Sequence, residues 1–248
     1  GMVSRWRDTS LRFMAQKLWL PAVLAVTVGL LCQWLYAGEF NWVVIGVMTL
    51  VFWVTFSGLK DLWHKISGSV GLLKGLQGQS RSYYGMLFAH LGLAVTMVGA
   101  VMVSTYNEER DLRMAPGDTL RFGHYEFIFD GARQVQGPNY QSDQGRIRVL
   151  LDGEPYGEML PEKRLYPARG NVMTEAAIDP GLFRDLYVAM GESLGGGAWA
   201  IRIQYKPFVR WLWLGGLMMT FGGLLAATDP RYRKQARREA ARAAKVAV

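Results

Sequence analysis

The sequence has one cysteine, three histidines and no familiar catalytic motif. Cys32 lies inside an apolar run, where a small residue facing lipid or another helix is expected. The chain therefore has no internal disulfide, no CxxC redox pair and no zinc cluster. Residues 105–206, the longest polar stretch, contain no GxSxG, HExxH or Walker sequence. No catalytic residue can be assigned from motifs.

A cleavable signal peptide is also not evident. The first apolar run is long, and no convincing cleavage site follows it. The opening pair, Gly1 and Met2, is unusual for a natural start. It suggests a cloning remnant or one piece of a longer polypeptide.

Apolar and charged residues are both abundant, but they are segregated along the chain. Hydrophobic residues make up 50% of the sequence and charged residues 19%. This mixture is too polar for a pure membrane bundle and too apolar for an ordinary soluble domain. The nine tryptophans fit a membrane protein, because Trp and Tyr favour membrane interfaces.

Four apolar runs are long enough to cross a bilayer, which takes about 20 helical residues. They cover residues 18–36, 42–59, 84–104 and 207–228. The predicted fold class is a polytopic α-helical membrane protein with four transmembrane helices and an inserted, mainly β domain. No span has a charge in its interior and no pair of broken helices is evident, which argues against a transporter half.

The distribution of Lys and Arg predicts the topology. Four lie in the flank 1–17, four in the segment 60–83 and seven in the last 18 residues, whereas the connector 37–41 has none. By the positive-inside rule both termini and segment 60–83 are cytoplasmic, and domain 105–206 is periplasmic in a bacterial inner membrane. This pattern explains the net charge of +8 without nucleic-acid binding.

The segments outside the spans have distinct characters. Residues 60–83 read as a basic amphipathic loop on the membrane surface, with His64 solvated at the interface. Residues 229–248 form a basic tail. Residues 105–206 alternate apolar and polar side chains and contain the hairpin signal Asp152–Gly153, which predicts about six to eight strands in a sandwich or barrel. His124 falls in a turn.

The third span contains a single histidine, His90. A titratable imidazole at membrane depth is costly and is therefore a functional-site candidate. Small neighbours on the same helix (Gly85, Ala89, Gly92 and Ala94) would leave a gap for a flat macrocycle, and neutral imidazole is a common axial ligand of heme iron. From the residues alone three readings stay open: a structural hydrogen bond to a neighbouring helix, heme ligation, and a proton or ion path.

Seven stretches resemble the cytochrome c maturation protein F (CcmF) family, in order along residues 82–232. They are GMLFAHLG (85–92), NEERDLRMAPGD (107–118), QGPNY (136–140), PEKRLYP (161–167), MTEAAID (173–179), RDLY (184–187) and KPFVRW (206–211). The first two spans match more weakly. The membrane layout is also the same as in that family.

The resemblance implies a heme lyase component of cytochrome c maturation in the bacterial inner membrane. Its implied partners are the periplasmic heme chaperone CcmE, apocytochrome c and other maturation subunits of the CcmH and CcmI type. Heme from the chaperone would be joined to the CxxCH cysteines of the apocytochrome. A separate, permanent b-type heme lies in the membrane, and the resemblance makes His90 one of its axial ligands, hence the cofactor-binding and metal-ligating residue here.

The chain also departs from the family pattern. Members are more than twice as long, and the tryptophan-rich WWD segment, its two flanking histidines and the other b-heme ligand belong to an upstream portion. The connector 37–41 is too short to hold such a segment. The chain therefore resembles the C-terminal portion, which alone is not expected to catalyse heme attachment. The alternative is a non-catalytic, membrane-anchored periplasmic scaffold without a cofactor.

Overall fold

The chain folds into two compact units. The computed structural model describes residues 11–68, 71–168 and 170–231. Its helical unit comprises the described residues up to Thr105 and from Trp211, and its sandwich unit runs from Tyr106 to Arg210. The sandwich is inserted between the third and fourth long helices, so the predicted fold class is confirmed.

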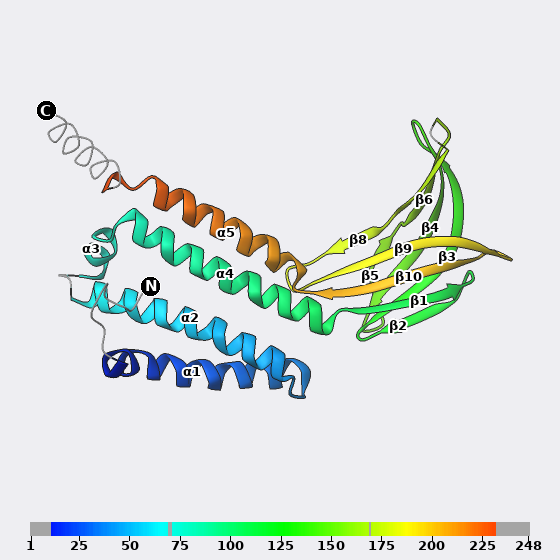
Figure 1. Ribbon diagram of the computed structural model, residues 1–248. Helices are drawn as coiled ribbons and strands as arrows, with labels where there is room; N and C mark the ends of the chain where they lie inside the picture. The colour runs from blue at the N-terminus through cyan, green and yellow to red at the C-terminus, as the bar shows by residue number, and fades with distance from the viewer. Residues whose placement is uncertain (1–10, 69–70, 169, 232–248) are drawn as a thin grey trace, which may run out of the picture. The chain divides into compact units, whose positions relative to one another are not determined.

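Four long helices and one short helix make up the helical unit (Figure 1). They are α1 (Leu11–Ala37), α2 (Trp42–Ser67), α3 (Leu72–Gln77), α4 (Arg81–Tyr106) and α5 (Val209–Ala227). The four long ones are long and apolar enough to cross a membrane. Helix α2 continues to Ser67 and α4 begins at Arg81, so helix occupies much of segment 60–83. The helical spacing of its apolar residues suits a continued helix as well as a surface loop.

A tight connection joins α1 to α2. Asn41 caps α2, because its side-chain oxygen accepts hydrogen bonds from the N–H groups of Val43 and Val44 at 3.0 and 3.3 Å. Within the pair, Gly29 lies against Thr49, and a Cβ at Gly29 would come within 3.0 Å of the threonine hydroxyl. The two helices therefore form a closely packed hairpin.

Two aspartates tie α4 to its neighbours. Asp61 of α2 accepts a hydrogen bond from the Tyr83 hydroxyl at 2.9 Å. Asp229, just beyond α5, accepts from the Ser82 N–H at 2.9 Å and from the Arg231 N–H at 2.9 Å. Both backbone hydrogen bonds lower the pKa of Asp229, and the one from Arg231 has the larger effect. Asp229 thereby satisfies one of the unpaired donors at the start of α4.

The sandwich unit contains two antiparallel sheets (Figure 1). The four-stranded sheet has the order β1 (Glu108–Met114), β10 (Ala198–Pro207), β9 (Arg184–Gly195) and β8 (Ala177–Pro180). The six-stranded sheet has the order β2 (Thr119–Phe122), β3 (Tyr125–Gln136), β4 (Gln141–Leu151), β6 (Glu162–Tyr166) and β7 (Asn171–Glu175), and β5 (Glu154–Met159) pairs with β4.

The sandwich core comes from alternating residues of both sheets. Phe127 and Phe129 of β3 are completely buried. Ile201 and Ile203 of β10 have at most 1% of their surface exposed. Alternation along a strand places every second side chain on the same face. The alternation of apolar and polar side chains noted for residues 105–206 therefore places these apolar residues in the core.

The number of strands exceeds the sequence prediction. We expected about six to eight, and the described residues form ten. Three of the ten, β6, β7 and β8, are short, and β6 lies within the PEKRLYP stretch. Their side chains are mostly exposed or half-buried. Without a buried face they carry no alternating signal.

The predicted Asp152–Gly153 turn is present between β4 and β5. Both residues have positive φ, 52° for Asp152 and 89° for Gly153. Two consecutive positive φ angles characterise the turn that matches strand twist in a two-residue hairpin. The Asp152 N–H also donates to the His124 carbonyl at 2.9 Å, which joins this hairpin to the β2–β3 turn.

Candidate functional site

His90 lies half-buried on α4 with one ring nitrogen already engaged. Its Nδ1 is 2.8 Å from the carbonyl oxygen of Met86, one turn earlier. Because a carbonyl only accepts hydrogen bonds, Nδ1 is the protonated nitrogen in this arrangement. The lone pair of the neutral imidazole is then on Nε2. Metal-binding histidines commonly hold the other ring N–H in this way, which fixes the tautomer and the ring orientation.

The small residues beside His90 serve mainly to pack α4 against α5. A Cβ at Gly92 would lie 2.7 Å from the Gly215 carbonyl oxygen, and one at Gly222 would lie 2.6 Å from that of Gly85. The two helices thus touch through paired glycines, which let their backbones approach closely.

We expected the small neighbours of His90 to leave a gap for a macrocycle, and this packing corrects that expectation. Gly85, Ala89 and Gly92 face α5 and leave no gap for a macrocycle. At 100° per residue, His90 points about 140° away from Gly85 around the helix. Its own face includes Ala94, one turn further along, which is buried. Of the four small neighbours, Ala94 alone shares the side of the helix that His90 occupies.

The other histidines lie outside the long apolar runs. His64 is exposed near the end of α2, and His124 is exposed in the turn between β2 and β3. The His124 Nδ1 is 2.7 Å from an Asp152 carboxylate oxygen, so it supports the paired hairpin turns. No group of three His, Cys, Asp or Glu side chains suited to a metal ion occurs in residues 11–68, 71–168 and 170–231.

Two buried polar atoms of the helical unit have no hydrogen-bond partner within the described part of the chain: the Trp53 Nε1 and the Thr96 hydroxyl. Threonines elsewhere in these helices bond to the carbonyl four residues earlier, as Thr27 and Thr55 do. Thr96 instead lies against Gly215 of α5. A buried unpaired donor is costly, so the Trp53 indole suits a partner outside these residues.

Arg184 links the two sheets at one end of the sandwich. Its guanidinium donates to the hydroxyls of Tyr125 on β3 and Tyr156 on β5, each at 2.7 Å. A third hydrogen bond reaches the Asp179 carboxylate on β8 at 2.6 Å. Burial alone would lower the pKa of Arg184, but these hydrogen bonds outweigh it and raise the pKa. The group is therefore a permanent cation held by both sheets.

A second arginine cluster, the Arg164 cluster, joins two of the stretches singled out in the sequence. Arg164 bonds to Glu162 at 2.7 Å and lies over the Tyr140 ring, with its guanidinium carbon 4.5 Å from the ring centre. The Tyr140 and Tyr166 rings are 5.6 Å apart. The QGPNY and PEKRLYP stretches are thus neighbours.

A cleft of about 520 Å³ opens on the side of β6 that carries Lys163 and Leu165, the chain neighbours of Arg164. Its lining includes Lys163 and Leu165 of β6, Val172 of β7, Glu192 of β9 and Trp199 of β10. Leu165 and Val172 are 41% and 56% exposed, so the cleft offers apolar side chains to a partner. Lys163 and Glu192 form an ion pair of 2.7 Å between the two sheets.

Comparison with known proteins identifies the relatives of this fold. Residues 105–207 match the family described as the CcmF C-terminal beta-sandwich. The chain is 49% identical over 233 residues to the cytochrome c-type biogenesis protein CcmF of Pseudomonas aeruginosa, covering 94% of this chain and 35% of that protein. It is 41% identical over 235 residues to CcmF of Escherichia coli, with coverages of 95% and 35%. The chain belongs to the CcmF family.

It corresponds to one part of a CcmF protein. The chain spans 35% of the length of these curated relatives, and its match to the C-terminal beta-sandwich confirms that it resembles the C-terminal portion. A solved structure of a cytochrome c heme lyase CcmF has the same fold, with a TM-score of 0.70 and 18% identity over 90% of this chain and 36% of that one. The predicted family is therefore confirmed.

Several residues that hold the fold together were not predicted from the sequence. Asp61 and Asp229 bind the first turn of α4 through Tyr83 and Ser82, and Arg184 joins the sheets. Only Arg184 lay in a stretch already singled out, RDLY. The one sequence signal that could have indicated the two aspartates is an acidic residue in an otherwise basic flank, next to the end of a span. Their partners are too distant along the chain to predict.

Proposed function

We propose that this chain is the C-terminal portion of a CcmF-type heme lyase component. It would hold one side of a membrane b-type heme through His90 and present the sandwich to maturation partners. By the positive-inside pattern, the sandwich lies in the periplasm and the helices cross the bacterial inner membrane. Covalent attachment of heme to apocytochrome c would require the upstream portion as well.

The state of the His90 ring is the observation that carries the heme assignment. The Met86 carbonyl accepts from Nδ1, so Nε2 keeps a lone pair suited to iron. The residues fit one axial ligand, and the second is expected from a portion outside this chain. Bound between two such ligands, a b-type heme supplies one-electron chemistry whose potential its ligands and surroundings tune. The role of this chain is to hold and orient the imidazole.

Support for the docking role comes from the sandwich cleft, whose lining includes the exposed Leu165 and Val172. Exposed apolar side chains on a preorganised surface suit a protein partner, because little freedom is lost on binding. The partners proposed for this surface are the heme chaperone CcmE, apocytochrome c and subunits of the CcmH and CcmI type.

Heme absorbance tests the ligand directly. In membranes that contain this chain with its upstream portion, His90→Ala should abolish or shift the Soret band. His64→Ala, which removes an exposed histidine of the same unit, should leave the band unchanged. An unaltered Soret band in His90→Ala, at equal protein level, would show that His90 is not a ligand.

Capture of partners tests the docking role. Val172→Asp and Leu165→Asp place a charge in the cleft and should reduce retention of CcmE or apocytochrome c by the full protein. Ile178→Asp changes another exposed apolar residue, 51% accessible on β8, and serves as the control. Equal retention by all three variants would remove the cleft from consideration.

The second candidate is a membrane-anchored scaffold without a cofactor. One observation favours it: the contacts of Gly85 and Gly92 with α5 explain the small residues of α4 without a macrocycle. The scaffold predicts no Soret band in any preparation and a normal capture of partners. The two candidates therefore give opposite results in the absorbance experiment.

A further inference from the structure

The turn between β8 and β9 exposes two adjacent apolar side chains, Leu182 and Phe183, which we call the β8–β9 tip. They have 59% and 58% of their surface exposed. Single apolar side chains are normal on a protein surface, whereas two large neighbours at one turn form a patch that loses free energy in water. Such a patch is stabilised where an apolar surface covers it.

The turn that carries the tip is held by two charged side chains. The buried Asp185 carboxylate accepts a hydrogen bond from the Gly181 N–H at 3.0 Å. The Arg184 guanidinium donates to the Asp179 carbonyl and carboxylate at 3.2 and 2.6 Å. A Cβ at Gly181 would lie 2.5 Å from the Arg184 carbonyl oxygen, so the turn is tight. These contacts give the turn one defined shape, which directs the tip outward.

The tip is bonded to the residue that precedes a candidate transmembrane span. The Phe208 N–H donates to the Phe183 carbonyl at 2.9 Å, and the two rings meet edge to face with their centres 5.7 Å apart. The next residue, Val209, begins α5, which is long and apolar enough to cross a membrane. Because a span starts one residue after this contact, the tip lies at the membrane boundary.

Both connections to the spans leave the four-stranded sheet at the end that carries the tip. In the strand register Arg184 pairs with Pro207, and Glu108 pairs with Tyr205. Helix α5 begins two residues after Pro207, and α4 ends two residues before Glu108. Consecutive Cα atoms are about 3.8 Å apart, so Pro207 and Glu108 each lie within about 8 Å of a span end. This end of the sheet is therefore the one beside the lipid.

We propose that the β8–β9 tip inserts into the interfacial region of the lipid bilayer. Leu182 and Phe183 there leave water for the boundary between headgroups and acyl chains, where leucine and phenylalanine are favoured. The exposed Arg210, in the first turn of α5, pairs with Asp185 at 3.4 Å. An arginine at the end of a span keeps its charge among the headgroups while its stem covers apolar surface. The proposal is independent of the heme assignment and of which side of the membrane carries the sandwich.

Insertion of the tip also sets the height of the cleft proposed for docking. Glu192, which lines that cleft, lies eight positions after Arg184 on β9. At about 3.3 Å per residue, Glu192 is about 26 Å further along the strand. A sandwich held to lipid at one end thus keeps its cleft in water, within reach of a soluble partner. This consequence rests on the proposed docking role, whereas the insertion does not.

A fluorescent label that nitroxide lipids quench tests the insertion. The full chain with Cys32→Ala receives one cysteine at a time, is labelled with a nitrobenzoxadiazole maleimide and is reconstituted into phosphatidylcholine vesicles with or without nitroxide lipid. We expect blue-shifted, quenched emission from Leu182→Cys and unshifted, unquenched emission from Leu194→Cys. Leu194 is the matched control, because it is also a leucine, is 51% exposed and lies at the other end of β9.

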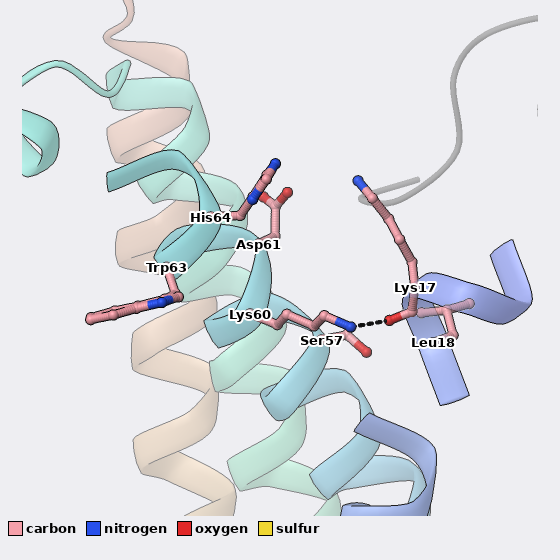
Figure 2. Close-up of a pocket in the computed structure, with 7 residues that line it drawn as sticks. All are labelled: Lys17, Leu18, Ser57, Lys60, Asp61, Trp63 and His64. Atoms are coloured by element: carbon pink, nitrogen blue, oxygen red, sulfur yellow. Dashed lines mark hydrogen bonds between the residues drawn. The ribbon is translucent and has the colours of Figure 1, made fainter. Parts of the chain in front are cut away.

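A position on α2 calibrates the depth of the label. Trp63 is 61% exposed near the end of a candidate span, and its ring points away from Lys17 and Lys60 in Figure 2. Tryptophan is favoured at membrane interfaces, so a label on Trp63→Cys reports interfacial quenching in the same vesicles. It also verifies that the spans are inserted. The label on Leu182→Cys should be quenched to a similar extent.

Two results would overturn the proposal. Emission from Leu182→Cys that is neither shifted nor quenched would place the tip in water. Shifted emission that nitroxide lipids leave unquenched would show that protein covers the tip, either the helices of this chain or a second copy. Adding Phe183→Asp to Leu182→Cys should weaken the quenching, because a charge at the tip opposes insertion.

Discussion

Arg184 shows how one side chain can secure the two sheets of the sandwich to each other. It starts β9 in the four-stranded sheet and bonds to Tyr125 and Tyr156 in the six-stranded sheet. Its side chain is only 12% exposed, so water replaces these partners poorly. The three hydrogen bonds leave in different directions from a planar fork, which a lysine cannot reproduce.

Replacing Arg184 with lysine should destabilise the sandwich. The substitution keeps the charge but leaves at least one phenol and part of the Asp179 pairing unsatisfied. Hydrogen bonds to a charged group are worth about 1.5 to 3 kcal/mol, so we expect a loss of about 2 kcal/mol. Urea unfolding followed by the infrared β-sheet band measures it.

Arg148→Lys provides the matched control for that change. Arg148 also forms a multiple hydrogen bond, with Asp130 at 2.7 to 3.1 Å, but its side chain is 49% exposed. Solvent screens exposed pairs, so this variant should unfold almost like the parent. Equal destabilisation by the two variants would contradict the role given to Arg184.

Helix α4 has two faces with different contents, one that packs against α5 and one that carries His90. One face carries Gly85 and Gly92 and packs on α5. The opposite side carries His90 and the buried Leu87 and Ala94. Close backbone packing on one face fixes the rotation of the helix and so the direction of the imidazole. The paired glycines therefore position His90 without touching it.

Adjacent glycines of α5 test this packing. Gly222→Leu would drive a side chain into the α4 backbone, whereas Gly223 has open space around it and Gly223→Leu should be tolerated. Overpacking costs about 1 to 3 kcal/mol, and we expect a loss in that range for the first variant alone. Unfolding of the helical unit in sodium dodecyl sulfate, followed by circular dichroism, measures the difference. Similar curves for the two variants would refute the glycine contact.

The elements that were predicted correctly are those with a local signal. Alternation around Phe127, the Asp152–Gly153 turn and the four apolar runs each depend on residues close in sequence. The contact between Ser82 and Asp229 joins residues 147 positions apart and left no local trace. For the candidate site, the sequence correctly predicted that His90 lies in a long apolar helix. The side of α4 on which its small neighbours lie emerged only from packing with α5.

At the scale of the whole molecule, the chain combines a helical unit and a sandwich unit with separate cores. The sandwich is acidic in sequence, with 15 Asp and Glu against 12 Lys and Arg in residues 105–206, whereas the flanks of the spans are basic. The basic flanks, and not the acidity of the sandwich, are what the positive-inside rule uses to predict an orientation.

Single-cysteine labelling should reveal that orientation. Cys32 is the only cysteine, so Cys32→Ala gives a background without thiols. In intact spheroplasts an impermeant maleimide should label Glu154→Cys, in the sandwich, and should reach Lys74→Cys, in α3, only after the membrane is opened. Labelling of Lys74→Cys first would reverse the proposed topology.

Chemical rescue distinguishes an axial position of the His90 imidazole at a membrane heme from a purely structural role. His90→Gly is prepared in the protein that includes the upstream portion, and its Soret band is recorded with and without free imidazole. We expect a lost or shifted band that imidazole restores toward the parental spectrum, because the free base fills the vacated position. A parental spectrum in His90→Gly before any imidazole is added would contradict the claim.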